Sequence, residues 1–96
     1  MFVGLLRLEL RLHGVDSLKG KRAIVKPILE RTRRKFHCAA AETGDNDNHH
    51  LAQIGISVVG NDQSFLNGCL DNIANYIESL NLAEVIDQEW EILSFP

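Results

Sequence analysis

The stretch FVGLLRLELRL (residues 2–12), followed directly by HGVDSLKGKRAIVKPIL (residues 13–29), decides the fold because the spacing of its apolar residues changes midway. In the first part apolar and charged residues alternate, which is typical of a strand with one buried face. From Leu18 onward the apolar residues recur every three or four positions, which predicts an amphipathic helix. Ser17 precedes this helix and is a favourable N-cap. Pro27 lies inside it and removes one backbone hydrogen bond, so we expect a kink or a first-turn break there.

The rest of the chain predicts three more strands and one more helix. The strands are expected at residues 36–42, 51–59 and about 84–95, and the second helix from Asn61 or Asp62 to Leu80. On that helix and the last strand we expect Phe65, Ile86, Trp90 and Ile92 to face inward. One shared core is expected to contain Leu8, Leu29, Ile73, Ile77 and Trp90.

The order strand, helix, strand, strand, helix, strand predicts an α+β fold. Two split βαβ units with right-handed crossovers form a ferredoxin-like βαββαβ sandwich, with a four-stranded sheet and both helices on one face. Residues 1–96 then form a single domain. Because the first and last strands are neighbours in that fold, we expect Arg7 and Arg11 to pair across the sheet with acidic residues of the last strand, namely Asp87, Glu89 and Glu91.

The charges of the chain are strongly segregated. All ten Lys and Arg residues lie at positions 1–35, where three acids leave about +7, and the ten remaining acids give residues 36–96 about −10. Eight of the ten cations lie between Lys19 and Lys35, on the first predicted helix. A concentration of positive charge on one helix favours an anionic partner.

The first turn of this helix is the sharpest candidate for a binding site. Cations are unfavourable near the N-terminus of a helix, where the helix dipole is positive. A bound phosphate would offset this repulsion, because it is negatively charged and can accept hydrogen bonds from the free backbone N–H groups. The predicted phosphate- or RNA-binding residues are Ser17, Lys19, Lys21, Arg22, Lys26 and Arg33. We expect Lys21 and Arg22 to lie exposed at the helix start. The alternative is that these cations only solvate the helix.

Four segments resemble the YlxP-like family of small bacterial proteins of unknown function. They are VGLLRLEL (3–10), SLKGKR (17–22), VVGND (58–62) and IESL (77–80). The resemblance covers nearly the whole length and implies a ferredoxin-like fold. It also implies work on or near the ribosome, because such proteins are often encoded beside translation-initiation and ribosome-maturation genes.

Other residues predict little chemistry. Asp45, Asp47, His49 and His50 lie in a polar loop whose spacing matches no metal signature, so we expect a connection and no metal or other cofactor. Cys38 and Cys69 have no CxxC spacing and are expected to be buried free thiols.

We found no catalytic motif and therefore assign no catalytic residue. No apolar stretch would span a membrane or form a signal peptide, so we expect a cytoplasmic protein.

The sequence therefore predicts a non-enzymatic binding protein that uses its basic first helix. The expected partner is ribosomal RNA or a ribosome-associated factor. The alternative is a structural homo-oligomer, such as a homodimer, that packs through its open sheet face at the small residues Gly55 and Ser57 and has no role with nucleic acid.

Overall fold

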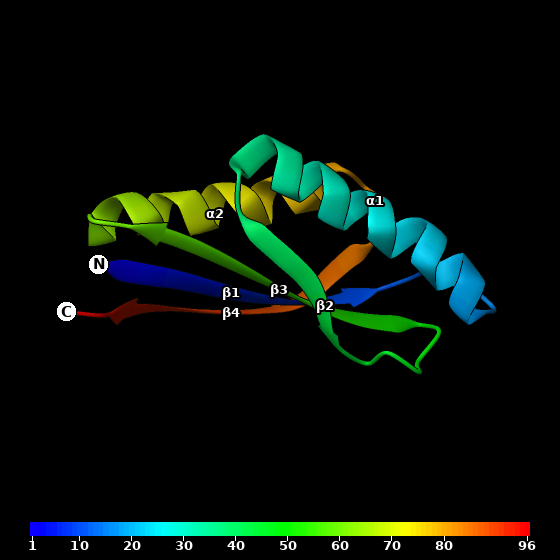
Figure 1. Cartoon of the computed structure of the whole chain (residues 1–96). Helices are drawn as coiled ribbons and strands as arrows, with labels where there is room; N and C mark the ends of the chain where they lie inside the picture. The colour runs from blue at the N-terminus through cyan, green and yellow to red at the C-terminus, as the bar shows by residue number, and fades with distance from the viewer.

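A computed structural model describes residues 1–96 and contains the six predicted elements in the predicted order. The strands are β1 (Phe2–Arg11), β2 (Ala39–Gly44), β3 (Leu51–Gly60) and β4 (Glu84–Ser94), and the helices are α1 (Leu18–Phe36) and α2 (Gln63–Ser79). The sheet has the order β2-β3-β1-β4, and every neighbouring pair is antiparallel. Both helices cover one face of the sheet and leave the other bare (Figure 1). This arrangement confirms the ferredoxin-like α+β fold.

The core lies between the sheet and the two helices. The even-numbered residues of β1 point into it, and Leu8 and Leu10 are completely buried. Leu8 faces Ile54 across the β1–β3 ladder, and α2 covers this layer with Leu70, Ile73 and Ile77 among other residues. The predicted core residues Leu8, Ile73 and Ile77 are therefore confirmed, and Leu29 packs against the same cluster.

Two predicted boundaries around the first helix are wrong. Phe36 is the last residue of α1 rather than the start of a strand, because His37 ends the helix in the left-handed conformation and donates its N–H to the Arg33 carbonyl. The strand begins only at Ala39. Pro27 causes no break either, since α1 continues through it to Phe36.

Three residues predicted to face inward are exposed. Phe65 is 67% exposed, because Leu66 and not Phe65 lies on the buried stripe of α2. Trp90 is 52% exposed on β4, an outer strand with no neighbour on one side. At Ile86 the β1–β4 register shifts, so Val85 packs against the core in its place.

The predicted ion pairs between β1 and β4 are present for Arg7. Its Nη2 atom lies 3.0 Å from Asp87 Oδ2, and its Nε atom lies 3.7 Å from Glu89 Oε1. The hydrogen bond that Arg7 donates to the Asp87 carboxylate raises the pKa of the Arg7 guanidinium above its ordinary value. Arg11 pairs instead with Glu84, at 3.7 Å, near the other end of the same ladder. The cations of β1 are thus partly neutralised within the sheet.

Candidate nucleic-acid interface

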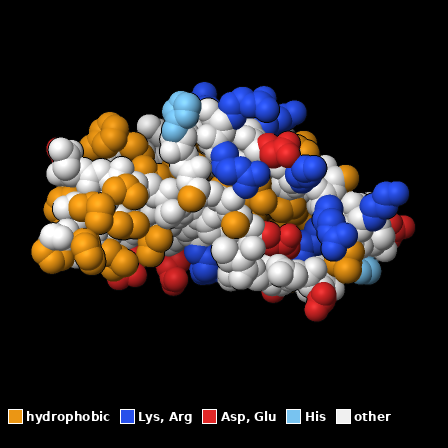
Figure 2. All heavy atoms as spheres, in the orientation of Figure 1, with side chains coloured by type: hydrophobic (Ala, Val, Ile, Leu, Met, Phe, Trp, Pro, Cys, Tyr) orange, Lys and Arg blue, Asp and Glu red, His pale blue; other side chains and the backbone are white.

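The outer face of α1 is the most positively charged surface of the molecule. Figure 2 shows blue side chains gathered over this helix and few red ones among them. Seven Lys and Arg side chains are exposed on α1, and its only acid is Glu30. They are Lys19, Arg22, Lys26, Arg31, Arg33, Arg34 and Lys35. We call this set the basic face.

The start of α1 is capped as predicted. The Ser17 hydroxyl accepts a hydrogen bond from the Gly20 N–H at 3.0 Å, and the Ser17 carbonyl accepts one from the Lys21 N–H. The capping hydroxyl is therefore occupied by the helix itself. The N–H groups of Leu18 and Lys19 are the ones in the first turn without an intrahelical acceptor.

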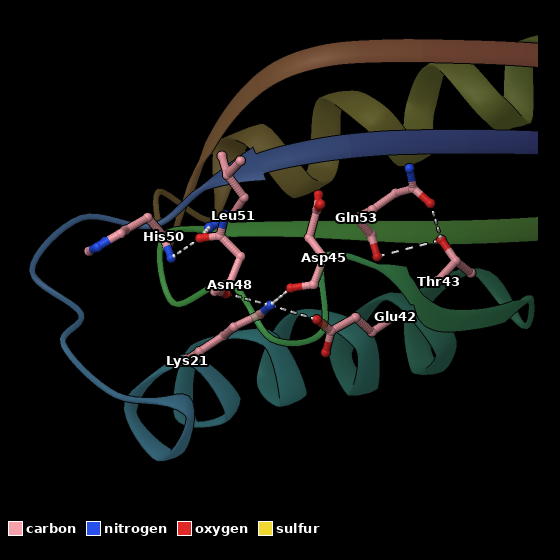
Figure 3. A network of polar contacts seen from close by, with 8 residues as sticks. All are labelled: Lys21, Glu42, Thr43, Asp45, Asn48, His50, Leu51 and Gln53. Carbon is pink, nitrogen blue, oxygen red and sulfur yellow. Dashed lines mark hydrogen bonds and ion pairs between the residues drawn. The ribbon is translucent and has the colours of Figure 1, made fainter.

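Lys21 does not lie on the basic face, and the prediction of an exposed position for it is wrong. Its side chain points inward, and the residue is 1% exposed. The ammonium donates hydrogen bonds to the backbone carbonyls of Asp45 and Asn48, the latter at 2.8 Å. It also lies 2.9 Å from Glu42 Oε2 (Figure 3). With these three partners, Lys21 fastens the β2–β3 loop to the first turn of α1 and is not available to a ligand.

The β2–β3 loop, residues 45–50, is shorter than predicted because β2 continues to Gly44. Asn48 orders it from within, since its Oδ1 atom accepts hydrogen bonds from the N–H groups of His50 and Leu51 at 2.8 and 3.2 Å (Figure 3). Asp45 adopts the left-handed conformation at φ 60°. No three His, Cys, Asp or Glu side chains of the molecule are grouped so as to hold a metal ion.

Three other cations of α1 make contacts within the chain that differ in kind. Lys26 Nζ lies 4.0 Å from Glu30 Oε1, a surface pair that restrains it little. Arg33 Nη1 donates to the Ala40 carbonyl at 2.6 Å, which ties the end of α1 to β2. Lys35 Nζ lies 5.2 Å from the centre of the Tyr76 ring.

Four cations of the basic face make no ion pair, hydrogen bond or cation–π contact within the chain, and they span the length of the helix. They are Lys19, Arg22, Arg31 and Arg34. Of the residues predicted to bind phosphate, Lys19, Arg22 and Lys26 lie together on the basic face, Arg33 is partly engaged and Lys21 is excluded. Arg31 and Arg34 were missed, although the helical period already places them away from the buried stripe.

The two cysteines are half-buried and not joined. The Cys38 thiol lies 3.8 Å from the Thr32 carbonyl, and burial raises its pKa above the ordinary value. A raised pKa keeps the thiol protonated and unreactive at neutral pH. Neither helix combines the length and apolar character that crossing a bilayer requires.

Comparison with known proteins agrees with the fold. A family described as "Protein of unknown function (DUF503)" matches residues 3–90. The "Uncharacterized protein YlxP" of Bacillus subtilis (strain 168) is 29% identical over 90 residues, which cover 92% of this chain and 98% of that protein. The "De novo designed protein Foldit4" superposes with a TM-score of 0.52 at 15% identity, over 99% of this chain and 98% of that one, and this likeness concerns the fold alone. The chain therefore belongs to the DUF503 family and is YlxP-like.

Proposed function

We propose that this protein binds an RNA backbone, with ribosomal RNA or an RNA-bearing ribosomal particle as the partner, and that the basic face of α1 makes the contact. The observation that carries the proposal is the exposure of seven Lys and Arg side chains beside a single acid on one helix. Cations on a solvent-exposed helix neutralise backbone phosphates and release counterions, which is the main source of non-specific affinity for nucleic acid.

The structure favours the whole length of the basic face over a pocket at the first turn. Lys21 is buried, and the Ser17 hydroxyl is occupied by its own helix. The exposed acids Asp16 and Asp47, one just before α1 and one in the loop held by Lys21, would repel a phosphate at the first turn. Lys19 and Arg34 are separated by about 22 Å along the helix at 1.5 Å per residue, so several phosphates can be contacted at once.

The open sheet face does not offer the alternative mode of RNA recognition. RNA-binding sheets of the aromatic type stack bases on exposed rings of their central strands. In this sheet the outward residues at the middle of β1 and β3 include Arg7, Glu9, Gln53, Gly55 and Ser57, and none is aromatic. Helix α1 is therefore the surface to test.

The test is the salt dependence of binding to a short single-stranded RNA, measured by fluorescence anisotropy. Five phosphate contacts, by Lys19, Arg22, Lys26, Arg31 and Arg34, predict a slope of about −3.5 for log K against log salt, from roughly −0.7 per contact. Affinity should then fall roughly a hundredfold between about 50 and 200 mM salt. Replacing Lys19 and Arg22 by Gln should reduce the slope to about −2 and weaken binding.

A matched control separates a local contact from the effect of net charge. Ser64→Asp with Asn67→Asp, both exposed at the start of α2, changes the net charge by the same −2 as Lys19→Gln with Arg22→Gln. The control should retain most of the affinity and the full slope. Equal losses in the two double variants would contradict a contact at α1. A wild-type protein that prefers polyglutamate to RNA, or binds neither, would overturn the proposed function.

A further inference from the structure

The bare face of the sheet carries a patch of apolar side chains at one end. Val3 of β1 faces Val59 of β3 and Leu93 of β4 across the two ladders, so these three lie in one row on the side away from the helices. Leu5 follows in the next outward position of β1, and the Met1–Phe95 backbone bonds extend the ladder beyond Val3. Figure 2 shows hydrophobic atoms gathered at this end of the molecule, where β1 begins and β4 ends.

These side chains are open to solvent to an unusual degree. Val59 is 62% exposed, Phe95 60% and Leu93 43%. Together with Met1 and Leu5 they leave on the order of 400 Å² of apolar surface, which is within the range of the largest apolar patch on a monomeric protein, a patch that is often functional. We call Met1, Val3, Leu5, Val59, Leu93 and Phe95 the apolar patch.

A hollow lies beside the apolar patch on the same face. It has a volume of about 700 Å³ and runs from β2 across β3 and β1 to β4. Its floor is made of small residues, including Ala39, Ala41, Gly55 and Ser57, and Leu5 belongs to both the hollow and the patch. The face thus presents an exposed apolar patch and a recess side by side.

We propose that the open sheet face is the interface between two copies of this chain. A twofold axis between the patch and the hollow would seat the apolar patch of each copy in the hollow of the other. This is the self-complementary arrangement that a symmetric dimer requires, because each contact then occurs twice.

The area of the face suits a weak dimer. A standard interface buries roughly 800 Å² on each partner. The patch supplies about half of this area, and the floor and walls of the hollow supply the remainder when two sheets stack. An interface of this size with few aromatic side chains predicts association that reverses on dilution.

The charges also favour a second copy over a charged partner. No member of the patch is charged. The charged side chains that line the hollow are Arg7, Glu89 and Glu91; Arg7 pairs with Glu89 and with the nearby Asp87, and Glu91 makes no ion pair within the chain. The two helices cover the other face of the sheet (Figure 1). In a sheet-to-sheet dimer the two basic faces therefore lie outside and far apart, so they neither repel each other nor lose access to RNA.

Sedimentation equilibrium over a wide concentration range tests the proposal. The wild-type protein should rise from a mass near 10.8 kDa toward twice that value as its concentration increases. Val59→Lys should stay monomeric throughout with an unchanged melting temperature, because the new charge would be buried in the interface while the residue is exposed in the monomer. Leu93→Lys, on a different strand of the same row, should do the same, so the result does not depend on one variant folding.

Phe65→Lys is the matched control. It also replaces an exposed apolar residue by Lys, but on α2 in the helix layer, and it should dimerise as the wild type does. A wild-type protein that stays monomeric at millimolar concentration would overturn the proposal and leave the face to a different protein. Dimerisation that survives Val59→Lys and Leu93→Lys but not Phe65→Lys would also overturn it. Dimer formation by Lys19→Gln with Arg22→Gln should be normal, which keeps this test separate from RNA binding.

Discussion

Replacing Lys21 by Met should destabilise the fold, although the substitution lies in the basic segment and changes only one charge. The Met side chain keeps most of the length and the apolar stem of Lys but has no donor. The carbonyls of Asp45 and Asn48 then lose their hydrogen bonds, and Glu42 loses its cation at 2.9 Å. Because the side chain is buried, no solvent cation takes its place.

The size of the loss follows from these three contacts. A hydrogen bond to a charged group contributes about 1.5–3 kcal/mol, and breaking a buried pair by removing one partner costs about 3–5 kcal/mol. The Glu42 Oε2 atom that faces Lys21 is buried, but the Glu42 side chain as a whole is 24% exposed, so water can reach part of it and the lower part of these ranges applies. We expect a loss of about 3 kcal/mol in the free energy of unfolding, which lowers the melting temperature of a domain of this size by roughly 12–24 °C.

Urea denaturation followed by circular dichroism measures this loss. The matched control is Lys19→Met, two residues earlier on the exposed side of the same helix turn, which should change the free energy of unfolding by less than about 0.5 kcal/mol. Combining Lys21→Met with Glu42→Gln should recover part of the loss, because no unpaired carboxylate is left near the core. Equal stabilities of Lys21→Met and Lys19→Met would refute the assignment of Lys21 as a buried anchor.

Three further predictions concern the core, the sheet surface and the loop. Ile77→Ala should lower the free energy of unfolding by about 2–4 kcal/mol, because the residue is 2% exposed; a loss below about 1 kcal/mol would contradict its place in the core. The neighbouring Asp45 carboxyl and, after it, burial raise the pKa of Glu9 above its ordinary 4.5, so the stability due to Glu9 is present at low pH and is lost as pH rises through the raised value. Glu9→Gln should therefore gain stability relative to the wild type as pH rises from about 4.5 to 7, and a constant difference in urea midpoints would show that Glu9 is unperturbed. His49→Ala with His50→Ala should leave the melting temperature unchanged with and without Zn²⁺; a Zn²⁺-dependent shift in the wild type alone would establish a metal site in the loop.

The fold was predictable because the apolar residues of each element recur with the spacing of a strand or of a helix. The alternation in residues 2–12 and the helical spacing after Leu18 are strong local patterns, and the element order then restricts the topology. The burial of residues on the outer strand β4 was harder to predict. The exposure of Trp90 depends on how much of β4 the neighbouring elements cover, and the register shift near Ile86 leaves no trace in the apolar pattern.

The candidate site was predictable in charge but not in detail. Lys21 lies four residues before Val25 and seven before Ile28, so the helical period already places it on the buried stripe. A lysine is not expected on a buried stripe, because a buried ammonium needs hydrogen-bond acceptors. Here the acceptors come from a loop more than twenty residues away in the sequence. Only the tertiary structure shows which cations remain free.

Mapping the RNA contact by amide chemical shifts tests the proposed function most directly. Titrating the ¹⁵N-labelled protein with a short single-stranded RNA at constant protein concentration should shift the amide signals of α1 from Lys19 to Arg34. The signals of the open sheet face, such as those of Gly55, Ser57 and Val59, should not move. Shifts confined to the sheet face or to α2, or no shifts at low salt, would contradict the assignment of α1 as the nucleic-acid interface.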